Sequence, residues 1–131
     1  MLIVYMSVVG NTRKFVHKLE QPLLEITTEN CFTEVDEPYL MVVPTYDIYT
    51  TDIMNDFIET GENQSYCRGV IGGGNWNFGK DLFCYTAQDI ALDYDVPLLH
   101  CFEFMGSKND VKKVKEIVEA IENTNSIQST H

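Results

Sequence analysis

Positive charge is scarce in this sequence. Lys and Arg together number 9 against 20 Asp and Glu, so the formal net charge is −11 at pH 7. Binding of nucleic acid through its phosphates and attachment to an anionic membrane surface both need clustered cations, so this balance argues against either partner. The chain also has no apolar run of the roughly 20 residues that span a bilayer, and we expect no membrane segment.

Closely spaced cysteines are absent as well. Cys31, Cys67, Cys84 and Cys101 form no Cys-x-x-Cys motif, and the first residues lack the basic segment and small-residue cleavage site of a secretion signal. We therefore expect a cytoplasmic protein with reduced thiols that pack as small apolar side chains. No metal site is expected, because the adjacent His100 and Cys101 would point to opposite faces of a strand.

What the chain does contain is enough apolar sequence for one core. Its 131 residues are 44% hydrophobic and 22% charged, which suits one compact domain and not two. We expect a single domain over residues 1–122, followed by a frayed polar tail over residues 123–131.

Short apolar segments of strand length recur along the chain. They are nearly continuous rather than alternating, which is typical of strands buried on both faces of a parallel sheet. The segments are Leu2–Met6, Leu23–Ile26 (the weakest), Tyr39–Val43, Cys67–Ile71 and Leu98–Phe102. The acidic stretch from Thr27 to Glu37 is too short for a full crossover helix and predicts a loop or a degenerate helical turn.

Apolar residues at helical spacing fill the intervals between these segments. The patterns follow Thr12, Thr51, Gly79 and Ser107, and Asp110 stands three residues after Ser107 as in a capping box. The alternation predicts an α/β fold with a five-stranded parallel sheet and helices on both faces. Five strands in this length favour the flavodoxin-like strand order 2-1-3-4-5.

In such a sheet ligands bind beyond the carboxyl ends of the strands, so the loops there should carry the site. The loop from Ser7 to Thr12 offers hydroxyls, a glycine and a helix start that suit a phosphate. It has neither the Lys-Ser/Thr of a Walker A loop nor a Gly-x-Gly-x-x-Gly fingerprint. A plain turn with Asn11 or Thr12 as the helix N-cap is the alternative.

Two further loops contain aromatic residues. Tyr46 and Tyr49, after the third strand, would either flank a flat ligand or cover the sheet end. Residues 72–79 place four glycines around Trp76 and Phe78, which would let the backbone approach a ligand closely. A phosphate loop, aromatic walls and amide side chains at one edge describe a site for flavin mononucleotide (FMN). No nucleophile or catalytic base stands out, which suits a redox protein whose cofactor supplies the chemistry.

Several segments, taken in order, carry a family resemblance. They are residues 6–16, residues 68–71 leading into the Gly-Asn-Trp-Asn-Phe-Gly of Gly74–Gly79, Val96-Pro97, and the Phe-Glu-Phe-Met-Gly-Ser of Phe102–Ser107 followed by Asp110-Val111. Together they resemble the NrdI family, the small flavodoxin-like proteins that assist class Ib ribonucleotide reductase. The similarity runs from residue 1 to about residue 122. It implies a bound FMN that takes electrons from an unidentified reductant and reacts with dioxygen to give a superoxide-level oxidant. That oxidant would pass to the dimanganese centre of the partner β subunit, where the tyrosyl radical forms.

The resemblance also implies which residues hold the cofactor. The first loop would bind the phosphate, the second would lie along the isoalloxazine ring, and the third would hold its other edge, with Phe78 stacking on the ring. The cofactor-binding residues expected are Ser7, Val8, Gly10, Asn11, Thr12, Thr45, Tyr46, Asp47, Gly74, Asn75, Trp76, Asn77, Phe78 and Gly79.

Two departures from the family pattern predict altered flavin energetics. The segment Thr45–Asp52 is short and has no glycine, so a peptide flip there would cost more than in typical members. Trp76 stands where the family often has a cation, which predicts a lower reduction potential. The main alternative function is that of a general single-electron-transfer flavodoxin. A signalling receiver domain is disfavoured, because Ser7, Thr45 and Glu103 stand where its acidic residues and lysine would be.

Overall fold

The computed structural model describes residues 1–75, 79 and 83–129, with side chains through residue 124. Its five strands are β1 (Leu2–Tyr5), β2 (Leu23–Glu25), β3 (Tyr39–Val43), β4 (Cys67–Gly74) and β5 (Leu98–Glu103). Its helices are α1 (Asn11–His17), α2 (Ile48–Glu59), α3 (Asn63–Tyr66), α4 (Tyr85–Asp93) and α5 (Lys108–Ser129).

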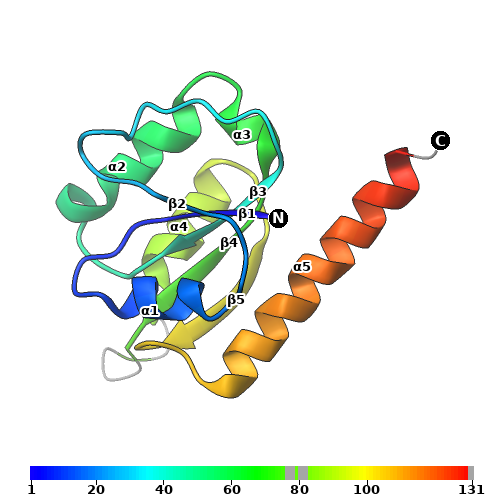
Figure 1. Cartoon of the computed structure of the whole chain (residues 1–131). Coiled ribbons are helices and arrows are strands. Elements are labelled where there is room, and N and C mark those ends of the chain that lie inside the picture. Colours follow the sequence, from blue (N-terminus) through cyan, green and yellow to red (C-terminus); the bar gives the residue numbers. More distant parts are fainter. Residues whose placement is uncertain (76–78, 80–82, 130–131) are drawn as a thin grey trace.

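The strands form one parallel sheet in the order β2-β1-β3-β4-β5, which confirms the predicted winding (Figure 1). All five residues of the central strand β3 are buried, as the continuous apolar run at that position predicts. The chain passes from β1 to β2 and then crosses to β3 on the other side of β1, so the direction of winding reverses there. The connections that follow β1 and β3 therefore lead to opposite faces of the sheet, to α1 and to α2. This divergence is the switch point at which doubly wound sheets bind their ligands.

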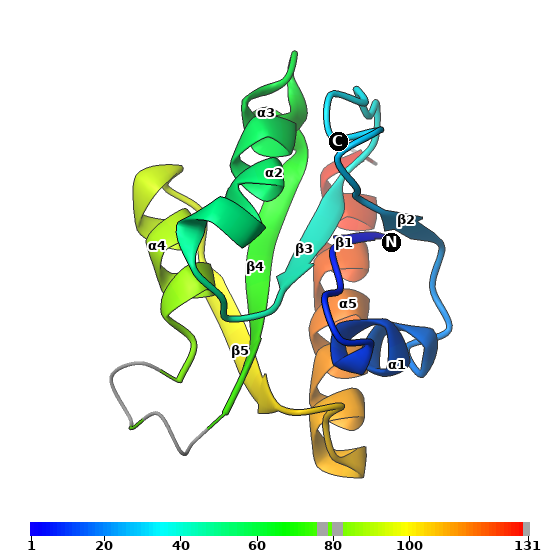
Figure 2. The same cartoon turned by 90° about the vertical axis from the view of Figure 1, so that its left-hand side faces the viewer.

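Helices cover both faces of the sheet, as the sequence predicts (Figure 2). Side chains of α2 and α4, among them Phe57 and Ile90, pack with one set of strand residues. Side chains of α1 and α5, among them Phe15 and Val114, pack with the alternate set. Because successive strand residues point to opposite faces, the two sets form two separate apolar layers.

Strand β4 runs to Gly74, so the prediction that residues 72–74 lie in a loop is wrong. Their lack of a side chain serves packing: a Cβ on Gly72 would lie 2.7 Å from the Ala87 Cβ atom, and one on Gly73 would lie 2.9 Å from the Phe102 ring. A Cβ on Gly74 would overlap the Phe83 carbonyl oxygen. These glycines allow α4, β5 and the turn before α4 to approach the strand closely.

Helix α2 begins at Ile48 and not after Thr51, because Asp47 caps it. The Asp47 carboxylate accepts a hydrogen bond from the Thr50 backbone N–H at 3.1 Å. Helix α4 begins at Tyr85, later than the pattern after Gly79 predicts, and residues 80–82 lie outside the described residues. Helix α5 continues to Ser129, through residues for which a frayed tail is predicted.

The acidic stretch between β2 and β3 is a loop, as predicted. It is held by Asn63, a fully buried side chain on α3. The Asn63 amide accepts from the Val35 backbone N–H at 2.9 Å and donates to the Thr33 and Phe57 carbonyl oxygens at 2.8 Å each. These three hydrogen bonds of the Asn63 amide thus hold the loop in place, in a connection that has no crossover helix.

Candidate functional site

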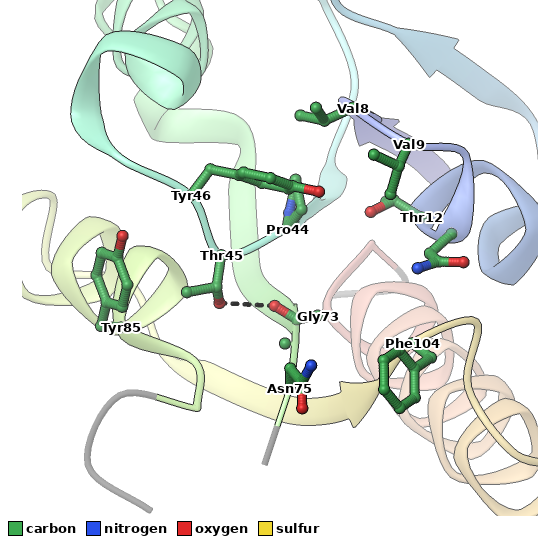
Figure 3. A pocket seen from close by; sticks show the side chains of 12 residues that line it. Val8, Val9, Thr12, Pro44, Thr45, Tyr46, Gly73, Asn75, Tyr85 and Phe104 are labelled. Atoms are coloured by element: carbon green, nitrogen blue, oxygen red, sulfur yellow. Dashed lines mark hydrogen bonds between the residues drawn. The ribbon is translucent and has the colours of Figure 1, made fainter. Parts of the chain in front are cut away.

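A cavity of about 500 Å³ opens at the carboxyl ends of β1, β3 and β4 (Figure 3). This volume lies within the range of roughly 300–1,000 Å³ common for small-molecule sites. The lining residues come from the end of β4, from the loops after β1, β3, β4 and β5, and from the starts of α1 and α4: Val8, Val9, Asn11, Thr12, Pro44, Thr45, Tyr46, Gly73, Gly74, Asn75, Tyr85 and Phe104. The cavity therefore lies at the predicted switch point.

The loop after β1 presents its backbone to one end of the cavity. Gly10 adopts a positive φ of 95° as the residue before α1, a conformation that side chains disfavour. No described residue accepts a hydrogen bond from the backbone N–H groups of residues 8–12, whereas the next one, on Arg13, donates to the Ser7 hydroxyl at 3.3 Å. These N–H groups are available to an anion, and the alternative of a side-chain cap from Asn11 or Thr12 is not what the structure shows.

The cation nearest to this loop in sequence is already paired. Arg13 makes a two-point ion pair with Glu25, with nitrogen–oxygen distances of 2.9 and 3.0 Å. Its hydrogen bonds lower the pKa of Glu25. Glu25 also accepts from the Tyr5 hydroxyl at 2.7 Å, and burial together with this contact raises the pKa of Tyr5 to about 12. An anion in the loop would thus be held by backbone dipoles rather than by Arg13.

The loop after β3 is fixed by two threonines. The Thr45 hydroxyl lies 2.7 Å from the Gly73 carbonyl oxygen and 3.2 Å from that of Phe83. The Thr86 hydroxyl accepts from the Tyr46 backbone N–H at 3.3 Å and donates to the Tyr46 carbonyl oxygen at 3.1 Å. These contacts join the loop to β4 and to the start of α4, so the backbone around Tyr46 is well positioned at the cavity.

The rest of the lining is largely apolar and aromatic. Tyr46, Tyr85 and Phe104 surround the cavity together with Val8 and Val9, and Figure 3 shows these side chains distributed around a common space. Val9 is 70% exposed and Phe104 50%, at the mouth of the cavity. A flat heterocycle would find apolar contact on several sides here.

The structure places the predicted residues unevenly. Those that line the cavity are Val8, Asn11, Thr12, Thr45, Tyr46, Gly74 and Asn75. Ser7, Gly10, Asp47 and Gly79 do not line it; Ser7 and Gly10 shape the first loop, and Asp47 caps α2. Trp76, Asn77 and Phe78 lie outside the described residues, so the expected stacking position stays a prediction.

Sequence reasoning missed Val9, Pro44, Gly73, Tyr85 and Phe104 as lining residues. Phe104 is the informative case: it follows β5, has a positive φ of 53°, and its backbone N–H donates to the Gly74 carbonyl oxygen at 3.1 Å. A large residue in this conformation is unusual. The Phe-Glu-Phe-Met-Gly-Ser segment contains this residue, but nothing in its spacing predicts that Phe104 lines the cavity.

The part of the chain that is described contains no group of three or more His, Cys, Asp or Glu placed to hold a metal ion. Within the same residues no helix has the length and apolar character that crossing a membrane requires. His17 is exposed, and His100 is bound to Asp110 on the far side of β5 from the α4 layer. Neither histidine lines the cavity.

The residues present fit a flavin nucleotide. N–H groups that have no acceptor among the described residues lie at one end and suit a phosphate, and an apolar, aromatic cavity at the strand ends suits a flat ring. The strand order and this site together define a flavodoxin-like α/β protein.

Comparison with known proteins gives the particular family. The family model described as "NrdI Flavodoxin like" matches residues 3–116. The chain is 40% identical over 125 residues to Protein NrdI of Streptococcus pyogenes serotype M4 (strain MGAS10750), which covers 89% of this chain and 86% of that relative. Protein NrdI of serotype M5 (strain Manfredo) is also 40% identical over 125 residues, with 76% of that relative covered. The chain belongs to the NrdI flavodoxin-like family, whose members are flavoproteins with a role in ribonucleotide reductase activation.

Proposed function

We propose that the cavity binds FMN and that the protein delivers a superoxide-level oxidant to the dimanganese β subunit of class Ib ribonucleotide reductase. The observation that carries the proposal is the joint placement, at the switch point, of an aromatic cavity and of backbone N–H groups that no described residue accepts from. Family membership supports the reductase as the partner. When bound, FMN supplies reversible electron storage and the electrons that reduce dioxygen.

The chain's own residues bind and orient the cofactor. The N–H groups of residues 8–12 would donate to the phosphate, and the positive φ of Gly10 gives the loop its shape. Thr45 and Thr86 hold the backbone around Tyr46, which would place the Tyr46 ring against the isoalloxazine. Residues 74–79, with Phe78 stacking, would hold the other edge of the ring.

The environment of the ring is expected to favour a neutral over an anionic flavin. The protein carries a net charge of −11, and the cation nearest the phosphate loop in sequence, Arg13, is paired with Glu25. The net negative charge of the protein would oppose a negative charge on the ring. This adds to the expectation that Trp76, at a position often cationic in the family, lowers the reduction potential.

Flavin titration tests the cofactor. We expect the full chain to bind FMN more tightly than riboflavin, because only FMN carries the phosphate that the loop would recognise. Gly10→Ala places a Cβ at a φ of 95°, a strain of about 1–2 kcal/mol on the binding conformation, and should weaken FMN roughly tenfold while leaving riboflavin affinity unchanged. Gly10→Asn is the matched control, since Asn tolerates positive φ better. Equal affinity for FMN and riboflavin would contradict the phosphate assignment.

Radical assembly tests the partner. The reduced, FMN-loaded protein is mixed with the manganese-loaded β subunit, and air is then admitted. We expect a tyrosyl-radical spectrum that depends on this protein and on dioxygen. If FMN binds and reduces normally but no radical forms, the general electron-transfer flavodoxin becomes the better interpretation.

A further inference from the structure

Two cysteines that the proposed function does not use lie together between β5 and α4. Cys101 on β5 is the register partner of Gly72 on β4. Its neighbours His100 and Phe102 belong to the opposite face, since His100 bonds Asp110 of α5 and Phe102 packs with the α1 and α5 side chains. Because strand residues alternate, Cys101 faces the α4 side of the sheet.

Cys84 reaches the same place from the turn before α4. A Cβ on Gly72 would lie 2.8 Å from the Cys84 Sγ atom, so this sulfur occupies the space that a side chain at position 72 would fill. Register-paired residues of neighbouring parallel strands are about 4.8 Å apart, which puts the Cys101 side chain directly beside that space. The two thiols therefore meet over the glycine.

The two sulfurs differ in exposure and in proton affinity. The adjacent Cys84 side chain lowers the pKa of Cys101, although partial burial opposes this. The same contact, together with burial, raises the pKa of Cys84. Cys84 is fully buried, whereas Cys101 is half-buried and lines a second cavity of about 570 Å³ beside Glu103 and Ser107. Cys101 is therefore the more accessible of the two thiols.

We propose that Cys84 and Cys101 form a redox-active dithiol that closes to a disulfide when a hydroperoxide enters the cavity beside Cys101. The Cys101 thiolate attacks a peroxide oxygen, so that an S–O bond forms, the O–O bond breaks and an alkoxide or hydroxide leaves with a proton from solvent. The Cys84 sulfur then attacks the sulfenic sulfur of Cys101. The S–S bond forms, and the sulfenic oxygen leaves as water with the Cys84 proton. The two thiols lose two electrons, and the hydroperoxide gains them.

The bridge would tie the turn before α4 to strand β5. Phe83 immediately precedes Cys84, and its carbonyl oxygen lies 3.2 Å from the Thr45 hydroxyl at the first cavity. The disulfide would thus cross-link a segment that frames this cavity. The remaining cysteines offer no such pair: the Cys31 thiol contacts the Thr28 carbonyl oxygen at 3.8 Å, and that of Cys67 contacts the Gly69 carbonyl oxygen at 3.6 Å.

Mass spectrometry of the full chain tests the proposal, with hydrogen peroxide as the probe. The reduced protein is treated with one equivalent of peroxide, denatured and alkylated. Before alkylation, we expect the intact mass to be lower by two hydrogen atoms than that of the reduced protein. After alkylation, the number of alkylated cysteines should drop from four to two, and digestion should yield a peptide linked through Cys84 and Cys101. Four alkylated cysteines, or a bridge between any other pair, would overturn the proposal.

Cysteine-to-serine variants test which thiols form the disulfide. Cys31→Ser and Cys67→Ser are matched controls, because each removes a buried thiol outside the pair, and both should still form the bridge. Cys84→Ser should leave a sulfenic acid on Cys101 that dimedone traps. Should that variant not fold, the intact-mass measurement on the unmodified sequence still decides. The readout is covalent and needs no flavin, so it stands or falls separately from the proposed function.

Discussion

Removal of the Thr45 hydroxyl should lower both the stability of the fold and the affinity for FMN. This hydroxyl lies within hydrogen-bonding distance of two carbonyl oxygens, 2.7 Å from that of Gly73 and 3.2 Å from that of Phe83. Thr45→Val keeps the shape of the side chain and removes the donor. The loop after β3 then loses its direct link to β4 and to the turn before α4.

The size of the expected stability loss follows from the two carbonyl oxygens, which would lose their hydrogen-bond donor. A neutral hydrogen bond contributes about 0.5–1.5 kcal/mol net, and a buried acceptor without a donor costs about 1–3 kcal/mol. Thr45 is only partly buried, so water can reach the site, and we expect a loss of about 1.5 kcal/mol in the free energy of unfolding. That corresponds to roughly a tenfold change in the folding equilibrium constant.

Urea denaturation followed by circular dichroism measures this loss. The midpoint should fall while the slope stays the same, since the surface exposed on unfolding does not change. Thr45→Ser retains the hydroxyl and should keep most of the stability. FMN affinity should fall with Thr45→Val and not with Thr45→Ser. A Thr45→Val protein with the original midpoint, or a Thr45→Ser protein that loses as much, would refute the assigned role of the hydroxyl.

Three further outcomes are expected. Asp47→Ala removes the cap of α2 and should cost about 1 kcal/mol in thermal or urea unfolding, while Asp47→Asn should retain most of it. Burial alone would raise the pKa of Asp110, but hydrogen bonds from the Ser107 backbone N–H and from His100 outweigh it, so the pKa lies below its ordinary 3.8. This stabilisation is present above that value and is lost as pH falls through the folded-state pKa, so Asp110→Asn should flatten the acid limb of stability against pH, and an unchanged limb would count against it. Gly72→Ala should destabilise the fold, because the added Cβ would lie 2.7 Å from the Ala87 Cβ atom and 2.8 Å from the Cys84 Sγ atom; a midpoint equal to that of the unsubstituted chain would contradict the packing role.

The sequence was sufficient for the arrangement of strands and helices. Apolar runs and helical spacings are local signals, and they predicted the β2-β1-β3-β4-β5 sheet with helices on both faces. The loop at Ser7–Thr12 could also be assigned to the strand-end edge, because the carboxyl ends of parallel strands share that edge. The boundaries of α2 and β4 were missed, since Asp47 as a cap and glycines as strand residues depend on their neighbours in space.

The site residues also include some that the sequence predicted and some that it did not. The strand-end loops and the family resemblance predicted Thr12, Thr45, Tyr46 and Asn75 as site residues, and all four line the cavity. Ser7, Gly10, Asp47 and Gly79 were predicted in the same way and do not line it. Phe104 was not expected, because its position depends on a positive φ and on a hydrogen bond to β4 that no spacing in the sequence encodes.

By itself, then, the sequence determined the fold class, the strand-end location of the site and the family resemblance. These follow from periodicity and from short motifs, which act over a few neighbouring residues. The tertiary structure alone decided that Gly72 makes room for α4 and that Cys84 and Cys101 meet above it. The reason is physical: strand register and helix packing bring together residues far apart in the chain, and only the folded backbone sets which side chains then share a space.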